Sequence, residues 1–479
     1  MPAPSDTPGS PLHCEAGSYR DRNGRVFYAA GSVYRVLSAR ALGDWESLAV
    51  TRFFRDACQA GGIVATERVA TADQPAALPA GDWAAVLKHG LIPFVSYPYE
   101  WSFGMLQDAA LLQLELLAAA LDEDFGLKDG SAYNIQWHGA RPVFIDVPSF
   151  ERLAAGEPWA GYRQFCQTML FPLMLHAYKN VAFHPWLRGC LDGIEPEQCR
   201  NLMSWRDVLR RGVLTHVVLQ SKLQSRYAAS DRNVKAELRS AGFHKSLIEA
   251  NVRGLIKTVR GLTWRQAASV WSEYATSHSY GDADQKTKQE FVSGVVRERR
   301  RKLVWDIGCN VGTYSRIAAE NSDYVLAMDG DHLAVERLYQ SLKAERCETI
   351  LPLVANLVDA SPNQGWRGAE RKGLAERGRP ELTLCLALIH HIVIGANVPL
   401  HEFVEWLAGL GGDLVIEFVT KDDAMVQTLL RNKRDDYSDY SREFFEQCLT
   451  QFFQIERRET ISTGARTLYY AVANRRAFA

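Results

Sequence analysis

One stretch near the middle of the chain constrains the fold more than any other. It reads Leu303-Val-Trp-Asp-Ile-Gly-Cys-Asn-Val-Gly-Thr-Tyr-Ser315, an apolar strand that ends in an acid and is followed by a turn with two glycines and a helix. Gly308 and Gly312 remove Cβ atoms where a ligand and a helix must approach the backbone closely. Because open α/β sheets bind ligands at the carboxyl ends of their strands, the stretch predicts a binding site beside Asp306.

The charge of this turn indicates the class of ligand. A dinucleotide site would need Gly-x-Gly-x-x-Gly to hold a pyrophosphate at the start of a helix, whereas this chain has Asp-x-Gly-x-x-x-Gly. A carboxylate here repels a pyrophosphate but suits a ligand with an ammonium group. The second strand ends in Ala327-Met-Asp-Gly-Asp331, where an acid is placed to accept hydrogen bonds from ribose hydroxyls.

The rest of this region alternates short apolar strands with segments of helix length, which predicts a parallel, doubly wound sheet. Two further strands follow each other with only a short turn between them, which predicts an antiparallel hairpin at one sheet edge. The expected strands are 303–307, 324–328, 349–354, 382–386 and 414–419, followed by the hairpin strands 452–460 and 466–473.

Together these features resemble the class I S-adenosylmethionine-dependent methyltransferases, and the resemblance covers residues 263–479. It implies a Rossmann-like α/β domain of seven strands with S-adenosyl-L-methionine as cofactor. In that family the glycine turn and the second-strand acid hold the donor, and residues after the third strand contact its adenine. The donor-binding residues implied are Asp306, Gly308, Cys309, Asn310, Gly312, Asp329, Gly330, Asn356 and Leu357. Asp359 competes with Asn356 and Leu357, and Asn310 replaces the usual central glycine.

Upstream of this region, Trp271-Ser-Glu-Tyr-Ala-Thr-Ser-His-Ser-Tyr280 precedes the helix that leads into the first strand. Segments at this place commonly fold over the donor in related enzymes. Tyr274, His278 and Tyr280 are therefore candidates for a lid, and aromatic packing between domains is the alternative.

The acceptor site is expected after the fourth strand, where the chain reads Ala387-Leu-Ile-His-His-Ile-Val-Ile394. The Asp/Asn-Pro-Pro-Tyr/Phe motif of enzymes that methylate nucleic-acid amines is absent from this position. His390 and His391 are candidate catalytic bases, because histidine can take a proton near neutral pH. A structural histidine pair is an alternative, and so is a metal site with Glu417 as third ligand, although we expect no metal. The predicted reaction is methyl transfer to a hydroxyl or amine of a small molecule or saccharide.

A second informative stretch lies in the first third of the chain. Leu127-Lys-Asp-Gly-Ser-Ala-Tyr-Asn134, followed by Pro142-Val-Phe-Ile-Asp146, resembles the catalytic loop of protein-kinase-like and aminoglycoside-phosphotransferase-like domains. The resemblance implies a base at Asp129 and magnesium ligands at Asn134 and Asp146. Three features of that family are missing. No glycine-rich phosphate loop occurs in 17–31, and Arg35 stands in the strand where the phosphate-binding lysine is usual. Leu127 stands two residues before Asp129, where a histidine is usual. We therefore expect a noncatalytic kinase-like domain with a vestigial site; a nucleotide-binding kinase and an unrelated α+β domain are the alternatives.

The expected elements of this first region are α+β in character. A hairpin is expected at 24–28 and 31–37, a helix at 45–60, strands at 62–69 and 91–97, a long helix at 105–121, and strands at 134–137 and 142–147. The expected domain order is a flexible tail at 1–16, the kinase-like domain at 17–151, a helical region at 152–262 and the methyltransferase domain at 263–479.

The chain carries Gly17-Ser-Tyr-Arg-Asp21 early, Pro93-Phe-Val-Ser-Tyr-Pro-Tyr-Glu-Trp101 in the middle and the His390-His391 pair in the last region. This combined layout resembles the NoeA-type nodulation methyltransferases of rhizobia. The formal net charge of −1 supplies no clear nucleic-acid signal, and we expect no membrane span, because the apolar run 111–121 is too short for one. Nine scattered cysteines favour a reducing cytoplasm. The N-terminal domain is expected to shape the acceptor pocket or to recruit a protein partner. The alternatives to a methyltransferase are a bifunctional kinase–methyltransferase acting on a saccharide and an interaction scaffold with a vestigial donor site.

Overall fold

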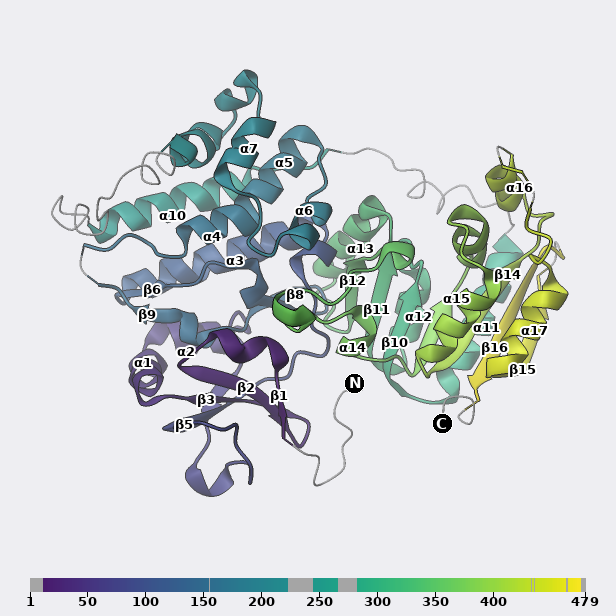
Figure 1. Ribbon diagram of the computed structural model, residues 1–479, viewed down its shortest axis with the longest axis horizontal. Coiled ribbons are helices and arrows are strands. Elements are labelled where there is room, and N and C mark those ends of the chain that lie inside the picture. Colours follow the sequence, from purple (N-terminus) through teal and green to yellow (C-terminus); the bar gives the residue numbers. More distant parts are fainter. Residues whose placement is uncertain are drawn as a thin grey trace.

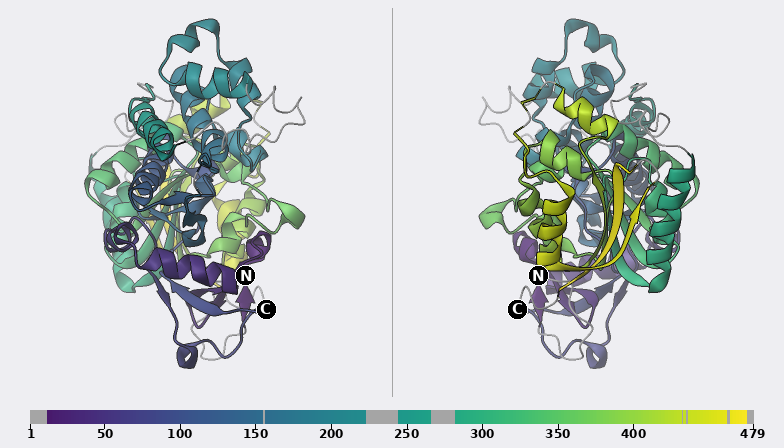
Figure 2. Two further views of the ribbon diagram at one scale, coloured as in Figure 1. Left: turned by 90° about the vertical axis from the view of Figure 1, so that its left-hand side faces the viewer. Right: turned by 90° about the vertical axis from the view of Figure 1, so that its right-hand side faces the viewer.

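The chain folds into two halves that lie side by side (Figure 1). The computed structural model describes residues 12–154, 156–222, 244–265, 282–431, 433–434, 436–461 and 464–474. The N-terminal half, up to residue 265, combines a small antiparallel sheet with a layer of helices. The C-terminal half, from residue 282, is built on one large sheet that is covered by helices on both faces (Figure 2).

The N-terminal half begins with a five-stranded antiparallel sheet of order β1-β2-β3-β5-β4. The hairpin predicted at 24–37 is confirmed, and its turn at Ala30-Gly31 has φ values of 46° and 73°, as a tight two-residue turn requires. The strands are β1 (His13–Cys14), β2 (Gly24–Ala29), β3 (Ser32–Leu37), β4 (Thr66–Arg68) and β5 (Ala85–His89).

Two expectations for this region are wrong. Residues 91–97 form no strand; the strand is β5, which ends at His89, because Pro93 lacks the N–H that a sheet ladder needs. Phe94 and Tyr97 of this stretch are buried against Arg377 of the C-terminal half instead, whereas Leu91 is 54% exposed. The helix expected at 45–60 is two helices, α1 (Ala39–Ala49) and α2 (Arg52–Gln59), with α2 starting after Thr51.

The long helix α3 (Phe103–Asp122) forms the centre of the N-terminal half. It is longer than the expected apolar run, and its length and composition would suffice to cross a membrane. However, most of its residues are buried, and it packs against α2, α5, α10, β6, β8 and α13. These contacts account for its apolar composition as that of a core helix.

Short strands and then helices complete this half. β6 (Phe125–Leu127) pairs with β9 (Phe150–Arg152), and β7 (Ile135–His138) forms a hairpin with β8 (Arg141–Phe144). The helices that follow are α4 (Tyr162–Phe165), α5 (Phe171–Lys179), α6 (His184–Gly189), α7 (Pro196–Leu202) and α10 (Lys245–Arg260), with π-helical turns at Cys166–Leu170 and Val213–Leu219.

The C-terminal half contains a seven-stranded sheet of order β12-β11-β10-β13-β14-β16-β15. β10 to β14 are parallel, whereas β16 runs antiparallel to both β14 and β15, so the predicted parallel sheet and the edge hairpin are both confirmed. The strands are β10 (Arg301–Ile307), β11 (Ser322–Asp329), β12 (Ile350–Val354), β13 (Leu382–Cys385), β14 (Asp413–Val419), β15 (Phe453–Thr460) and β16 (Arg466–Ala473).

Helices cover both faces of this sheet, and Figure 2 shows α15 and α17 on the face opposite α11. Burial on both faces explains why the parallel strands are almost continuously apolar. The helices are α11 (Asp282–Glu298), α12 (Thr313–Ala319), α13 (His332–Ala344), α14 (Leu374–Arg377), α15 (Leu400–Gly409), α16 (Ala424–Leu430) and α17 (Arg442–Phe452).

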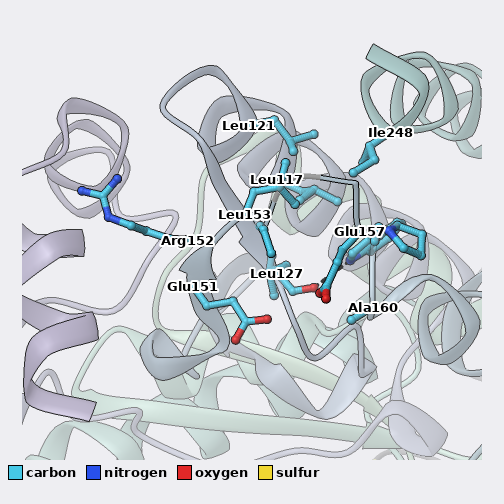
Figure 3. A pocket seen from close by; sticks show the side chains of 13 residues that line it. Leu117, Leu121, Leu127, Glu151, Arg152, Leu153, Glu157, Ala160 and Ile248 are labelled. Carbon is cyan, nitrogen blue, oxygen red and sulfur yellow. Dashed lines mark hydrogen bonds between the residues drawn. The ribbon is translucent and has the colours of Figure 1, made fainter. Parts of the chain in front are cut away.

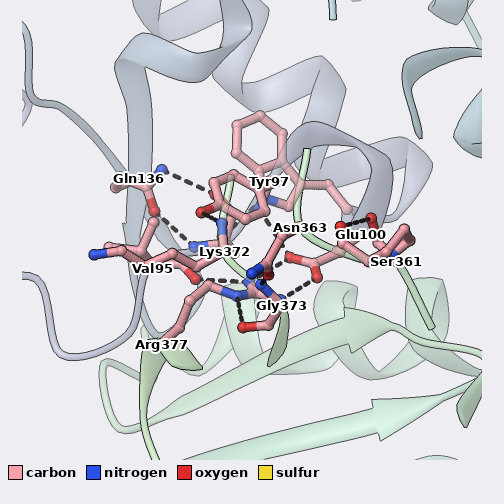
Figure 4. Close-up of polar contacts among 12 residues, drawn as sticks. Val95, Tyr97, Glu100, Gln136, Ser361, Asn363, Lys372, Gly373 and Arg377 are labelled. Atoms are coloured by element: carbon pink, nitrogen blue, oxygen red, sulfur yellow. Dashed lines mark hydrogen bonds and ion pairs between the residues drawn. The ribbon is translucent and has the colours of Figure 1, made fainter. Parts of the chain in front are cut away.

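The two halves are joined by a buried polar contact (Figure 4). Arg377 of α14 forms an ion pair with Glu100 at 2.5 Å, and the two side chains are only 3% and 9% exposed. The same guanidinium donates to the carbonyl of Val95 at 2.8 Å and lies 4.7 Å from the ring centre of Tyr97. The Tyr97 hydroxyl in turn accepts the backbone N–H of Lys372.

Backbone contacts extend this junction along the edge of the large sheet. Ala140 donates its N–H to the carbonyl of Cys347, and Gly139 donates to the Tyr324 hydroxyl, both at 2.9 Å. One continuous cluster of buried apolar side chains runs through both halves. The N-terminal half therefore packs against the β12 side of the sheet as part of the same core.

Candidate active site

The glycine turn after β10 has the backbone conformation that its sequence predicts. Gly308 and Gly312 have φ values of 77° and 81°, and Asn310, in the place of the usual glycine, has a φ of 50°. Asparagine tolerates this left-handed region better than most residues, which explains the replacement. A Cβ at Gly312 would lie 2.5 Å from a methyl carbon of Leu338, so this glycine lets α13 approach the turn.

Gly308 also leaves room for a neighbouring loop of the chain. A Cβ on Gly308 would point at Leu388, in the loop after β13, with 3.3 Å to its nearest methyl carbon. Gly308 therefore makes room for the chain's own loop. The Cys309 side chain is buried and burial raises its pKa well above the usual thiol range, so only its backbone is available at the turn.

Asp306 at the end of β10 faces the interior. It is 2% exposed and accepts a hydrogen bond from the Ser315 hydroxyl at 2.5 Å, which ties the strand to α12. Burial raises the pKa of Asp306 to about 7, although the Ser315 bond works against this rise, and the nearby charge of Asp329 adds to it.

Asp329 at the end of β11 joins two loops. One carboxylate oxygen accepts the N–H of Asn310 in the glycine turn, and the other accepts the N–H of Asp331, both at 2.8 Å. Burial raises the pKa of Asp329, and these two bonds oppose the rise. Gly330 lies exposed between Asp329 and Asp331, and Asp331 caps α13 by accepting the N–H groups of Leu333 and Ala334.

The loop after β12 lies next along the same sheet edge. Asn356 is exposed and its side chain accepts the N–H of Val358, at the start of the 3-10 turn Leu357–Asp359. Asp359 is paired with Arg188 of α6 at 2.9 Å. Because this ion pair already engages the Asp359 carboxylate, Asn356 and Leu357 remain the better candidates for contact with an adenine.

His390 and His391 follow β13 on the other side of the glycine turn. The turn that leads to them contains Ala387 at a φ of 51°, a strained value for alanine. The His390 side chain is fully buried, and within the described residues neither of its ring nitrogens has a hydrogen-bond partner. Burial lowers the pKa of both histidines, that of His391 to about 4. Both imidazoles are therefore neutral at pH 7.

A buried charged network adjoins the histidines. Glu417 of β14 is paired with Lys288 of α11 and, at 3.2 Å, with Arg466 of β16, which also binds Asp423 at 2.7 Å. Glu417 is thus held by two cations and does not serve as the third metal ligand considered from sequence. Among the described residues no group of three or more His, Cys, Asp or Glu side chains could hold a metal ion. Lys288, Arg466 and Asp423 carried no sequence signal, because each belongs to an ordinary amphipathic or strand pattern.

The three residues of the predicted kinase-like site, Asp129, Asn134 and Asp146, lie close together. Asp129 accepts the N–H of Ser131 at 2.9 Å, and burial, with the neighbouring Asp146 charge, raises its pKa. Asp146 is paired with Arg35 of β3 at 2.9 Å. Asn134 ends the 3-10 turn Ala132–Asn134 just before β7.

The whole chain has a recognisable relative. It is 33% identical over 462 residues to the nodulation protein NoeA of Rhizobium meliloti strain 1021, and the match covers 95% of each chain. The chain belongs to the NoeA family. No protein-family model matches it.

Solved structures resemble parts of this NoeA-family chain at low identity. The N-methyltransferase NodS of Bradyrhizobium japonicum WM9 is 12% identical, with a TM-score of 0.30, over 40% of this chain and 97% of NodS. The magnesium protoporphyrin IX methyltransferase of Synechocystis PCC 6803, solved with bound SAH, is 18% identical, with a TM-score of 0.28, over 43% of this chain and 93% of that enzyme.

Cavities of about 200 Å³ occur in the described part of this NoeA-family chain. One lies between the helical region and the loop after β11. Another is inside the N-terminal half, between α3, β6, β9 and α10, and is lined by leucine side chains together with Glu151, Arg152 and Glu157 (Figure 3). The predicted lid residues Tyr274, His278 and Tyr280 lie outside the described residues.

Proposed function

We propose that this chain is an S-adenosyl-L-methionine-dependent methyltransferase that transfers a methyl group to a hydroxyl or amine of a small molecule or saccharide. The observation that carries the proposal is the link between Asp329 and the glycine turn, at the carboxyl edge of a parallel sheet that ends in an antiparallel hairpin. Ligands of open α/β sheets bind at this edge.

The residues at this edge fit the donor in three ways. The Asp329 carboxylate beside the turn attracts a ligand that carries an ammonium and a sulfonium charge, its oxygens can accept hydrogen bonds from ribose hydroxyls, and Asn356 with Leu357 offers a polar and an apolar contact for a base. When bound, the donor supplies an activated methyl group. The protein's own contribution is positioning, which provides much of the rate of an in-line displacement.

The acceptor side is proposed to lie at His390 and His391. A neutral imidazole can accept a hydrogen bond from a hydroxyl or amine and so orient its lone pair toward the methyl group. Their lowered pKa values make both histidines weak bases. We therefore assign them orientation of the acceptor first, with the proton passing to them only as the new bond forms.

Donor binding tests this proposal. Replacing Asp329 with Ala should weaken binding of S-adenosylhomocysteine at least tenfold in calorimetric titration, because each hydrogen bond to a charged group contributes about 1.5–3 kcal/mol. Asp323→Asn, at the exposed opposite end of β11, is the matched control and should bind normally. Unchanged affinity of Asp329→Ala would refute the ribose role, and a wild-type chain that does not bind would refute the proposal.

We also infer that the N-terminal half contains a kinase-like domain without phosphotransferase activity. The elements of this half follow in the order that the resemblance requires. The small sheet comes first, then the long helix α3, the loop with Asp129 and Asn134, the β7–β8 hairpin and finally Asp146. Arg35 neutralises the Asp146 carboxylate that a magnesium ion would need. The turn between β1 and β2, where a phosphate loop would lie, is held by the C-terminal half through Arg20 and Glu370 at 2.6 Å.

Labelled ATP and magnesium test this inference. The full chain, incubated with candidate saccharide or protein acceptors, should transfer no phosphate above background, because positioning and charge stabilisation at the phosphate end are missing. Transfer that disappears in Asp129→Ala would overturn the inference in favour of a bifunctional enzyme.

A further inference from the structure

The short helix α6 of the N-terminal half touches both loops that the proposed donor would use (Figure 1). At its first residue, the His184 ring lies 4.1 Å from the ring of His332, three positions after Asp329. One turn later, Arg188 donates to the carboxylate of Asp359 at 2.9 Å and to its carbonyl at 2.8 Å. α6 therefore bridges the loop after β11 and the loop after β12.

α6 is itself firmly held, so it can fix these loops. The buried His184 donates its ring N–H to the carbonyl of Trp101 at 2.8 Å and stacks on Phe183 at 4.2 Å. Burial lowers its pKa well below the usual value, so it packs as a neutral ring. The Arg188 carbonyl also accepts a hydrogen bond from Gln364, downstream of the second loop.

A cavity lies next to these contacts, and His332 is part of its wall. Its volume is about 200 Å³, and its walls come from both halves: His176, Asn180, Ala182 and Trp264 from the helical region, and Asp331, His332 and Leu333 after β11. Asp331 is bonded to Asp329 through its backbone. One wall of the cavity therefore lies two positions after Asp329, the residue proposed to bind the ribose. Both walls carry polar side chains.

We propose that the helical region forms the outer wall of the pocket for the donor's adenosine, with Arg188 as a positioning residue. This inference rests on the proposed donor and names the part of the chain that shapes its site. Exposed loops lose conformational entropy when they close on a ligand, and loops already held in place lose less. The N-terminal half thus acts on the donor side of the sheet, whereas the acceptor histidines lie beyond β10.

Variants of the Arg188–Asp359 pair test the inference in the full chain. Arg188→Gln and Asp359→Asn should each weaken S-adenosylhomocysteine binding about three- to fivefold, and the double variant should be no weaker than either single variant. The thermal midpoint should not change, because the two side chains are 36% and 65% exposed.

The chain supplies a matched control at the other end of β12. Arg141 and Glu348 form an exposed pair between the same two halves at 2.7 Å, with exposures of 38% and 56%. Glu348→Gln should leave affinity unchanged. If Asp329→Ala weakens binding while both Arg188→Gln and Asp359→Asn bind normally, the inference is overturned and the proposed function stands. Absence of binding by the wild-type chain would overturn both.

Discussion

The two carboxylates of the proposed donor site differ in what surrounds them. Asp306 points inward and binds the hydroxyl of Ser315, whereas Asp329 binds backbone N–H groups of the two loops at the surface of the sheet edge. The Asp306 carboxylate is only 2% exposed, which leaves a ligand little access to it. We therefore expect Asp306 to fix the strand and the helix, and Asp329 to meet the ligand.

The titration of His391 leads to a prediction at the same scale. Its pKa is lowered from 6.5 to about 4, first by burial and then by the charge of Arg466. A depressed pKa in the folded state means that stability is present above pH 6.5 and is lost as pH falls toward 4. The free energy of unfolding should therefore drop over this range by up to about 3 kcal/mol from His391 alone.

Denaturant unfolding at several pH values measures this effect. His391→Asn should show a smaller fall in stability between pH 6.5 and 4 than the wild type does. His401, on the surface with a side chain that is 41% exposed, gives the control variant His401→Asn, whose free energy of unfolding at pH 7 should match that of the wild type. Identical pH profiles for wild type and His391→Asn would contradict the prediction.

At the scale of elements, the long connection between β12 and β13 attaches the two halves to each other. It carries Lys372 and the short helix α14, and these reach across to Glu15, Tyr97 and Glu100. Glu370 adds contacts to Tyr19 and Arg20. The connection between β12 and β13 therefore forms much of the contact with the N-terminal half, in addition to linking two strands of the sheet.

Removing the Arg377 side chain from this contact should destabilise the packing of the two halves against each other. Arg377→Ala leaves Glu100 as a buried charge without its guanidinium partner, which typically costs about 3–5 kcal/mol. In scanning calorimetry we expect a lower unfolding midpoint than that of the wild type. Arg379→Ala is the control, since Arg379 is exposed and donates only to the Gly409 carbonyl. Equal midpoints for the two variants would show that the ion pair is dispensable.

At the scale of the whole molecule, the large sheet could be predicted from the amino-acid sequence. Every strand from β10 to β16 lies within a few residues of its expected range, because a buried parallel strand is a short apolar run bounded by turn residues. The glycine turn and the acids at 306 and 329 could also be predicted. A turn with positive φ favours glycine, and an acid directly after an apolar run indicates the end of a strand, so both features are visible in the local sequence.

How the two halves meet and which charges are buried could not be predicted from the sequence and became clear from the three-dimensional fold. Glu100 and Arg377 are 277 residues apart, and Arg188 and Asp359 are 171 apart, so no periodicity or motif connects them. The same holds for Lys288, Glu417 and Arg466, each of which is unremarkable in its own segment. Sequence patterns report the local preferences of the backbone and which face of an element is apolar. Partners distant in the chain are selected by packing, which exists only once the elements have come together.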